Sequence, residues 1–143
     1  MGQVKTYNPR QVTVSLGNHA VSGFADDGFV EIEPLGDGIT SQSGCDGEVA
    51  RAIDPNQQYG VKLSLLQTSD SNAYLQSMYD RDRTTGGGAF DLLIQDLRGN
   101  TRFHAASAWV VKPATRSYGK DTNNREWELE TSYATIEEGT YSS

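Results

Sequence analysis

Hydrophobic and polar residues alternate along most of this chain. The alternation is clearest in the stretches 11–16, 29–33, 60–66, 89–95 and 125–131. Because successive side chains of a β-strand point to opposite faces, each stretch predicts a strand with one buried face. In the last stretch, Trp127 and Leu129 are expected to face a core, while the intervening glutamates face away from it. A longer, bulged strand is expected over 101–111.

Short polar segments rich in glycine separate these strands. Gly17-Asn18, Asp27-Gly28 and the segment 96–100 are typical of tight turns between antiparallel strands. The chain has 15 glycines, which agrees with many turns. The pattern therefore predicts a mostly β fold, an antiparallel two-sheet β-sandwich or barrel, built as a single domain over 1–143.

One segment has helical rather than strand periodicity. Tyr74, Leu75, Met78 and Tyr79 form an apolar stripe at helical spacing, and the Ser-Asp-Ser run 69–71 offers N-caps. These features predict one inserted α-helix over about 70–83. The glycines 86–88 that follow are expected to form a flexible linker.

Three segments lack a buried face and are expected to lie outside the core. The first ten residues are predicted to form an N-terminal arm, and 137–143 a frayed tail. The most unusual segment is a polar, glycine-rich arm over 34–47, followed by an extended run over 48–53. Long segments without structure of their own are usually functional or disordered. This arm therefore suggests a protein that contacts its neighbours.

Net charge and cysteine content exclude several classes of function. The formal net charge is −7, which argues against binding nucleic acid or an anionic membrane surface. No apolar run approaches the length of a membrane span, and the N-terminus lacks the apolar core of a signal peptide. With the one cysteine, Cys45, no intrachain disulfide can form. We expect a soluble protein made in a reducing cytoplasm.

No set of residues predicts catalysis, a metal site or a cofactor site. His19 and His104 lie in strand-like stretches, and Cys45 lies beside Asp46, whose charge disfavours a thiolate. The run starting at Asp70 resembles a calcium loop, but Tyr74 and Leu75 stand where an oxygen ligand and a glycine are needed. The sequence therefore predicts neither an enzyme nor a cofactor.

Charged residues are unevenly distributed between two loops. Basic residues gather around a second long polar loop, over 113–124, and acidic residues lie in and just after the arm. The former are Lys112, Arg116, Lys120 and Arg125; the latter are Asp37, Asp46 and Glu48. Two interpretations stay open: solvated loops that differ by chance, or complementary surfaces on successive copies of one protein, which would fix their register.

The order and spacing of the segments resemble the tail-tube proteins of bacteriophages with contractile tails, a fold shared with the type VI secretion tube. The match covers nearly the whole chain, although no single motif is diagnostic. The segments that carry it are Phe29–Pro34, Tyr59–Leu65, Phe90–Ile94, Asp96–Asn100, Ala108–Pro113 and Glu126–Glu130. The resemblance implies a structural virion protein of the tail, made in the host bacterial cytoplasm, that forms hexameric rings stacked into a hollow tube for DNA.

The resemblance also implies roles for particular residues and partners. The arm would reach onto neighbouring subunits through Leu35, Gly36, Asp37, Ile39, Cys45 and Asp46. Family members tend to have an acidic bore, and alternation puts Glu31, Glu33 and Glu48 on the face away from the core, as lumen candidates. The implied partners are further copies of the chain and the tail sheath, baseplate and tape-measure proteins. DNA would pass without specific binding, and no membrane is involved.

Alternatives to this interpretation remain at the level of the sequence. A type VI secretion-like tube protein has the same architecture. A small ligand- or carbohydrate-binding β-sandwich would need an exposed aromatic platform, for which Tyr59, Tyr118 and Tyr141 are the loop candidates. A hydrolase has no support in the sequence.

Overall fold

The computed structural model describes residues 4–26 and 28–141. After a short 3-10 helix, Pro9–Gln11, the elements follow in this order: β1 Val12–Leu16, β2 His19–Ala20, β3 Val30–Pro34, β4 Ile39–Ser43, β5 Val49–Ile53, β6 Tyr59–Leu66, α1 Ser71–Thr85, β7 Phe90–Asp96, β8 Thr101–Lys112, β9 Asn124–Thr131 and β10 Ala134–Glu137. All strand pairs among them are antiparallel.

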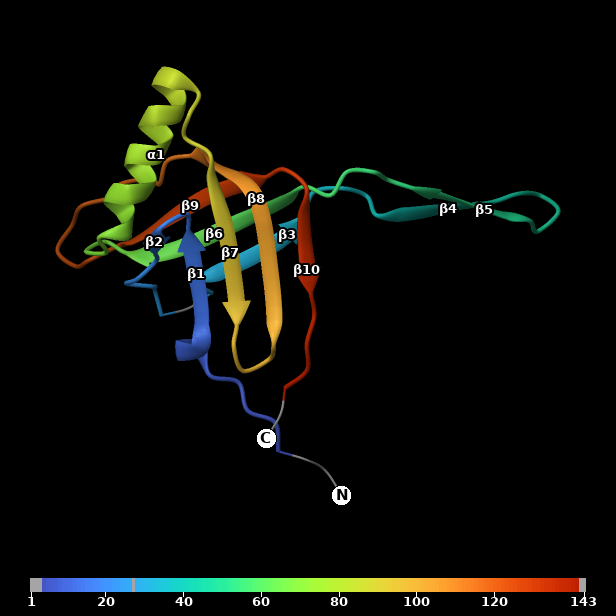
Figure 1. Ribbon diagram of the computed structural model, residues 1–143, viewed down its shortest axis with the longest axis horizontal. Helices are drawn as coiled ribbons and strands as arrows, with labels where there is room; N and C mark the ends of the chain where they lie inside the picture. The colour runs from blue at the N-terminus through green and yellow to red at the C-terminus, as the bar shows by residue number, and fades with distance from the viewer. Residues whose placement is uncertain (1–3, 27, 142–143) are drawn as a thin grey trace.

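The strands form two layers that cross each other (Figure 1). The first layer has the order β2-β1-β7-β8-β10, and the second has the order β9-β6-β3. Strand β8 joins them, because one of its edges is divided between two partners. Its residues 102–105 pair with β10, and its residues 108–112 pair with β9. The sandwich is therefore one hydrogen-bonded sheet folded over, rather than two separate sheets.

The predicted alternation places the core between these layers. Leu63, Leu65, Trp127 and Leu129 of the second layer are fully buried, as are Leu92 and Phe103 of the first. The predicted mostly β, antiparallel fold with one helix is thus confirmed for the described residues. The long strand β8 is irregular at two places, opposite the start of β7 and near its own end, as its predicted bulge required.

The turn between β7 and β8 is held by its first residue. Asp96 accepts hydrogen bonds from the backbone amides of Arg98 and Gly99. Asn100 completes the turn with a φ of 57°, a conformation that asparagine tolerates better than most residues. The predicted turn at 96–100 is therefore confirmed. In the predicted turn Asp27-Gly28, Asp27 lies outside the described residues.

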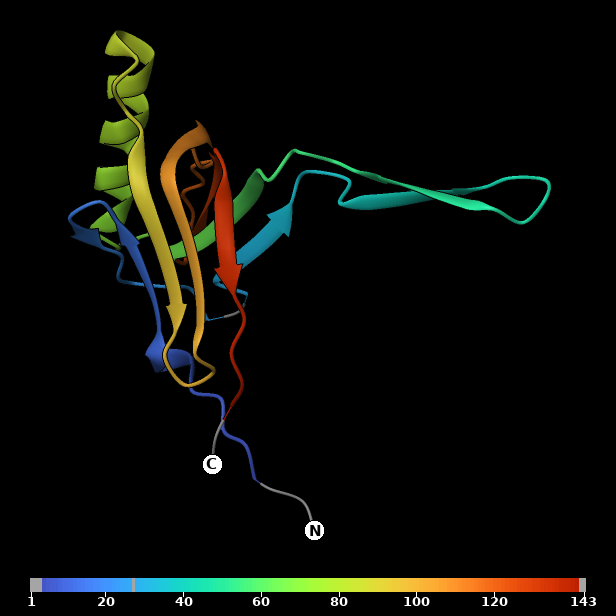
Figure 2. The same cartoon turned by 45° about the vertical axis from the view of Figure 1, so that its right-hand side comes forward.

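Helix α1 flanks the layers on the side opposite the β4–β5 hairpin (Figures 1 and 2). Leu75 and Met78 are buried, as the apolar stripe predicts. Within the predicted N-cap run 69–71, Asp70 stands at the cap position, but its side chain makes no capping hydrogen bond. Instead Ser69 Oγ accepts the amide of Ser71 at 3.2 Å.

Of the three glycines predicted to form a flexible linker, Gly86 and Gly87 are exposed, whereas Gly88 is packed against the helix. Gly86 ends the helix in the left-handed conformation, with a φ of 75°. A Cβ at Gly88 would collide with the carbonyl oxygen of Met78 and with Asp82. The sequence therefore needs glycine at 88 to let β7 begin close against the helix.

Both ends of the described chain pack near the β7–β8 turn. Asn8 caps the 3-10 helix through its side chain, and Tyr7 lies edge-on to Tyr141 with ring centroids 6.2 Å apart. The predicted frayed tail begins in β10, which the sequence did not predict, and stays in contact up to Tyr141, whose hydroxyl donates to Asp96. Residues 1–3 of the predicted arm and 142–143 of the tail lie outside the described residues.

Candidate assembly surfaces

The predicted arm is a β-hairpin that projects from the body of the molecule (Figures 1 and 2). Its strands are β4 and β5, paired from Ile39↔Ile53 at the root to Ser43↔Val49 near the tip. The predicted arm over 34–47 is thus extended, but it does not end at residue 47. The run 48–53 is the second strand of the arm, and Val49 does not face the core.

Asp54 ties the two strands together at the root of the hairpin. Its carboxylate accepts hydrogen bonds from the amide of Asp37 at 2.8 Å and from the amide of Asn56 at 3.0 Å. These two bonds hold the pKa of Asp54 below its usual 3.8. Gly36 allows the chains to meet there, because a Cβ would collide with the carbonyl oxygen of Asn56.

The two faces of the hairpin differ in character. Directly paired residues of antiparallel strands point to the same side, so one face carries three aliphatic side chains, two serines and an arginine: Ile39, Val49, Ile53, Ser41, Ser43 and Arg51. We call this the stem face. Its aliphatic side chains are 59%, 61% and 72% exposed. The other face carries only small or polar side chains, from Thr40, Gln42, Ala50 and Ala52. Exposed aliphatic side chains grouped on one face are common at protein–protein interaction sites.

The tip of the hairpin holds Cys45, Asp46 and Glu48. Cys45 is a free, exposed thiol. Asp46 accepts the amide of Glu48 at 3.1 Å and so shapes the turn. Glu48 is thus remote from Glu31 and Glu33 of β3, and the structure does not gather the three lumen candidates on one surface. Leu35, the first apolar residue after β3, instead lies over Gly60 of the body.

Glu31 and Glu33 belong to a larger acidic face on the second layer. Register places Glu31, Lys62 and Glu128 in one row across β3, β6 and β9, and Glu33, Gly60 and Glu130 in the next. These side chains point away from the core, on the side opposite Val61, Leu63 and Leu129. They line a shallow hollow together with Leu35 and Val111. We call this surface the acidic face.

The predicted basic loop is only partly available to a partner. Arg125 lies in β9 and is buried, 7% exposed, with its guanidinium 5.6 Å from the centre of the Tyr118 ring. Arg116 donates to Gln76 at 2.6 Å and lies over the Trp127 ring.

Two of the four predicted cations thus bind the loop to its own body. Lys112 and Lys120 are the other two, and both are exposed.

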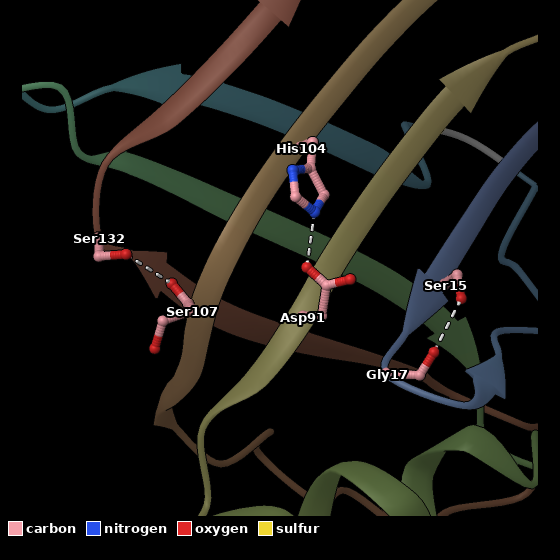
Figure 3. A network of polar contacts seen from close by, with 6 residues as sticks. All are labelled: Ser15, Gly17, Asp91, His104, Ser107 and Ser132. Carbon is pink, nitrogen blue, oxygen red and sulfur yellow. Dashed lines mark hydrogen bonds and ion pairs between the residues drawn. The ribbon is translucent and has the colours of Figure 1, made fainter.

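The outer side of the first layer carries a set of polar side-chain contacts (Figure 3). His104 Nε2 of β8 lies at hydrogen-bond distance, 2.7 Å, from Asp91 Oδ1 of β7. Ser132 Oγ donates to the carbonyl of Ser107 at 3.3 Å. His19 also has a serine neighbour, with its Nε2 2.9 Å from Ser71 Oγ, but Ser71 is completely buried at the start of α1. Each of the two histidines thus has a polar side-chain partner within its own chain.

The tyrosines proposed for a carbohydrate platform lie apart. Tyr59 packs edge-on against buried Phe103, Tyr118 stacks with Arg125, and Tyr141 binds Asp96. No aromatic contact among the described residues joins two of the three. Over the same residues, no group of three potential metal ligands is found. The described part of the chain also contains no helix of the length and apolarity that a membrane span needs.

Sequence reasoning missed two parts of these surfaces. It assigned Glu128 and Glu130 outward but did not join them to Glu31, because register between distant strands is not visible in a single sequence. It also missed the pairing of 39–43 with 49–53. A turn signal existed there, since Gly44 and Gly47 lie between two extended runs of equal length.

Known proteins with similar sequence and structure point the same way. The structural protein ORF10 of Pseudomonas phage KPP10 is 29% identical over 146 residues, covering 96% of this chain and 84% of that protein. Among solved structures, the anti-feeding prophage cap, a tube-terminating cap, aligns with a TM-score of 0.63 and 14% identity over 97% of this chain and 95% of its own.

A second solved structure has a similar fold. It is a sheath–tube complex of an extracellular contractile injection system in the extended state, with a TM-score of 0.58 and 11% identity over 93% of this chain and 92% of its own. These likenesses confirm the predicted tail-tube type of fold.

The family comparison covers nearly all of the body described above. The model of the bacteriophage PhiTE tail tube protein matches residues 11–138, which include every strand and the helix. This match confirms the predicted resemblance and the prediction of a structural, non-enzymatic protein of the phage tail. The chain belongs to the bacteriophage PhiTE tail tube protein family.

Proposed function

We propose that this chain is the tube subunit of a contractile phage tail, and that it assembles as rings of six copies stacked into a conduit for DNA. Family membership supplies the tube, and the fold shared with a sheath–tube complex supports the contractile type. The observations that carry the assembly are the acidic face of the second layer and two open strand edges, one on β3 and one at the end of β8.

The open edges provide a route to ring closure. Strand β3 ends the second layer, and no other strand of the described chain pairs with its outer edge. At the other end, residues 109–112 of β8 extend beyond the start of β7, whose Phe90 pairs with Ala108. Exposed edges pair readily with other strands. Pairing β3 of one copy with this end of β8 in the next would continue the layer around a closed ring and satisfy both edges.

The acidic face is our proposed wall of the lumen. Glu31, Glu33, Glu128 and Glu130 would give each copy several carboxylates there, with Lys62 between them. Glu48 is not part of this proposal, because it lies at the tip of the hairpin. Phosphates near such a wall are repelled within a Debye length of about 8 Å at physiological salt. This repulsion would keep DNA from adhering during passage.

The hairpin and the exposed lysines are the proposed contacts between subunits. Lys112 and Lys120 are the proposed counterparts of Asp46 and Glu48 on a neighbouring copy. The sheath, baseplate and tape-measure proteins are proposed partners of the finished tube, and the virion tail is its proposed location after synthesis in the host cytoplasm. Gly36 and Asn56 lie side by side at the root. A short linker between them can therefore replace the whole hairpin.

Excision of the hairpin tests the proposal. Replacing 37–55 by two glycines joins the root without cutting through β4 or β5. We expect a folded monomer with native circular dichroism that forms neither rings nor tubes in negative-stain electron microscopy, while the intact chain forms both. Normal tubes from the shortened chain would remove the hairpin from the assembly. A cryo-EM map of intact tubes with Glu31 and Glu128 on the outside would refute the proposed lumen wall.

A further inference from the structure

A groove opens between the two layers at the end of the molecule where β3 begins. It is lined by Tyr7, Phe29, Val30, Ile32 and Asp96, with buried Ile94 and Phe103 at its floor. Val30 and Ile32 are the core-side residues of β3, yet both stay only half-buried. We call this the β3 groove. It is an incomplete part of the core, because nothing in the described chain covers these aliphatic side chains fully.

The stem face of the hairpin has the chemistry to complete it. Ile39, Val49 and Ile53 are aliphatic and exposed, and they share the face with Arg51 and with the serines 41 and 43. The β3 groove is aliphatic and aromatic, with the carboxylate of Asp96 in its wall. Apolar surface would meet apolar surface, and the cation would meet the carboxylate.

Asp96 is well placed to receive a cation. It accepts the backbone amides of Arg98 at 3.2 Å and Gly99 at 3.1 Å, and its second oxygen accepts the hydroxyl of Tyr141. These donors fix the direction of the carboxylate before a partner arrives. A carboxylate oriented in this way selects the register of an incoming arginine.

The hairpin cannot fill the groove of its own chain. It leaves the body at Pro34, the end of β3, whereas the groove lies at Gly28 and Phe29, before the start of that strand. Both views show the hairpin extending away from the layers (Figures 1 and 2). The occupant must therefore be another molecule. A second copy fits best, because each copy carries both the exposed stem face and the open groove.

We propose that the stem face of one copy docks in the β3 groove of a neighbouring copy, with Arg51 beside Asp96. This inference rests on the proposed tube function and adds the receiving site to it. A two-stranded hairpin is only marginally stable on its own in water. Docking would let its aliphatic side chains pack against the neighbouring copy, which gives them a role.

Disulfide trapping between copies tests this arrangement. In a Cys45→Ser background, Val30→Cys and Ile53→Cys place one thiol in the groove and one on the stem face. Oxidised assemblies of the double variant are expected to give a ladder of cross-linked oligomers in non-reducing gels, which reduction abolishes. The matched control pairs Val30→Cys with Ala52→Cys, one residue away on the opposite face of the hairpin. After the same oxidation it is expected to run as a single uncross-linked chain on the gel.

The outcomes separate the docking from the tube itself. If the Cys45→Ser protein forms tubes but the Val30–Ile53 pair gives no more cross-links than the Val30–Ala52 pair, the docking is wrong and the tube function stands. An internal disulfide within one chain would also overturn the docking. If the Cys45→Ser and unaltered proteins both fail to form rings, the proposed function and this inference fall together.

A substitution that leaves the fold intact gives an independent measure. Arg51→Ala lies on the exposed hairpin and is expected to raise the concentration needed for polymerisation at least about tenfold, as truncating a central interface residue does. Gln42→Ala, on the opposite face, is expected to change that concentration less than about twofold. Equal effects of the two variants would overturn the role of the stem face.

Discussion

The carboxylate of Asp54 binds the backbone amide of Asp37 at 2.8 Å and thereby joins the two ends of the hairpin. The same group accepts the amide of Asn56, so one side chain fixes the angle at which the hairpin leaves the body. The strands beyond this point are exposed on both faces. The direction of the hairpin in the free subunit therefore depends on the root, and a tube subunit that inserts its hairpin into a neighbour benefits from a fixed direction.

Asp54→Ala is expected to loosen the hairpin without unfolding the body. The amides of Asp37 and Asn56 lose their acceptor, so their hydrogen exchange should accelerate, while the melting temperature stays nearly unchanged because the root is exposed. Hydrogen-exchange mass spectrometry of the monomer measures both regions. Asp46→Ala is the matched control, since it removes a similar bond at the tip. Faster exchange across the β-sandwich in Asp54→Ala would contradict a local role.

The same contact predicts a dependence on pH. The pKa of Asp54 in the folded chain lies below its usual 3.8, so the carboxylate stabilises the root above about pH 3.8. This contribution is lost as the pH falls through the lowered pKa. Amide chemical shifts of Asp37 and Asn56, followed by NMR down to about pH 2, are expected to move together with a midpoint below 3.8. Midpoints at or above 3.8 would show that the two bonds do not form in solution.

The sequence predicted the body well because each strand there has one buried face. Arg125 is an exception: it was predicted to belong to the basic loop, whereas it lies on the buried side of β9, two residues before Trp127. The same argument did not predict the pairing of β4 with β5. Neither face of β4 or β5 is buried in the monomer, so no buried face marked these strands in the sequence.

Asn72 provides a test of how the helix is attached to the core. Its Oδ1 accepts the indole N–H of Trp127 at 2.9 Å in a buried contact, and its amide donates to the carbonyl of Leu66. Asn72→Ala leaves a buried donor unsatisfied, which costs about 1 to 3 kcal/mol. Urea denaturation measures the loss. Gln76→Ala, which breaks an exposed bond to Arg116, is expected to stay within about 0.5 kcal/mol of the unaltered protein. Equal losses in the free energy of unfolding would mean that the buried bond stabilises the fold no more than the exposed one.

Tyr141 reports the closure of the C-terminal segment over the β7–β8 turn. Its hydrogen bond to Asp96 raises its pKa to about 12, with further contributions from desolvation and from the carboxylate charge. Because the folded pKa lies above the usual 10.0, the contact is fully formed below pH 10 and is lost as the pH rises through about 12. NMR titration of labelled tyrosines should find this value for Tyr141. Asp96→Asn should bring it back toward 10, and an unshifted Tyr141 in the unaltered protein would contradict the contact.

Salt distinguishes the two kinds of contact proposed between copies. Each chain carries a formal net charge of −7, so approaching copies repel one another. Raising ionic strength shortens the Debye length from about 30 Å at 0.01 M to about 3 Å at 1 M, and strengthens apolar burial little by comparison. If docking of the stem face dominates, the concentration needed for polymerisation should fall as sodium chloride is added, which sedimentation assays measure. The opposite trend would mean that attraction between charges dominates. Lys120→Glu would then suppress assembly, and a second change, Asp46→Lys, would restore it.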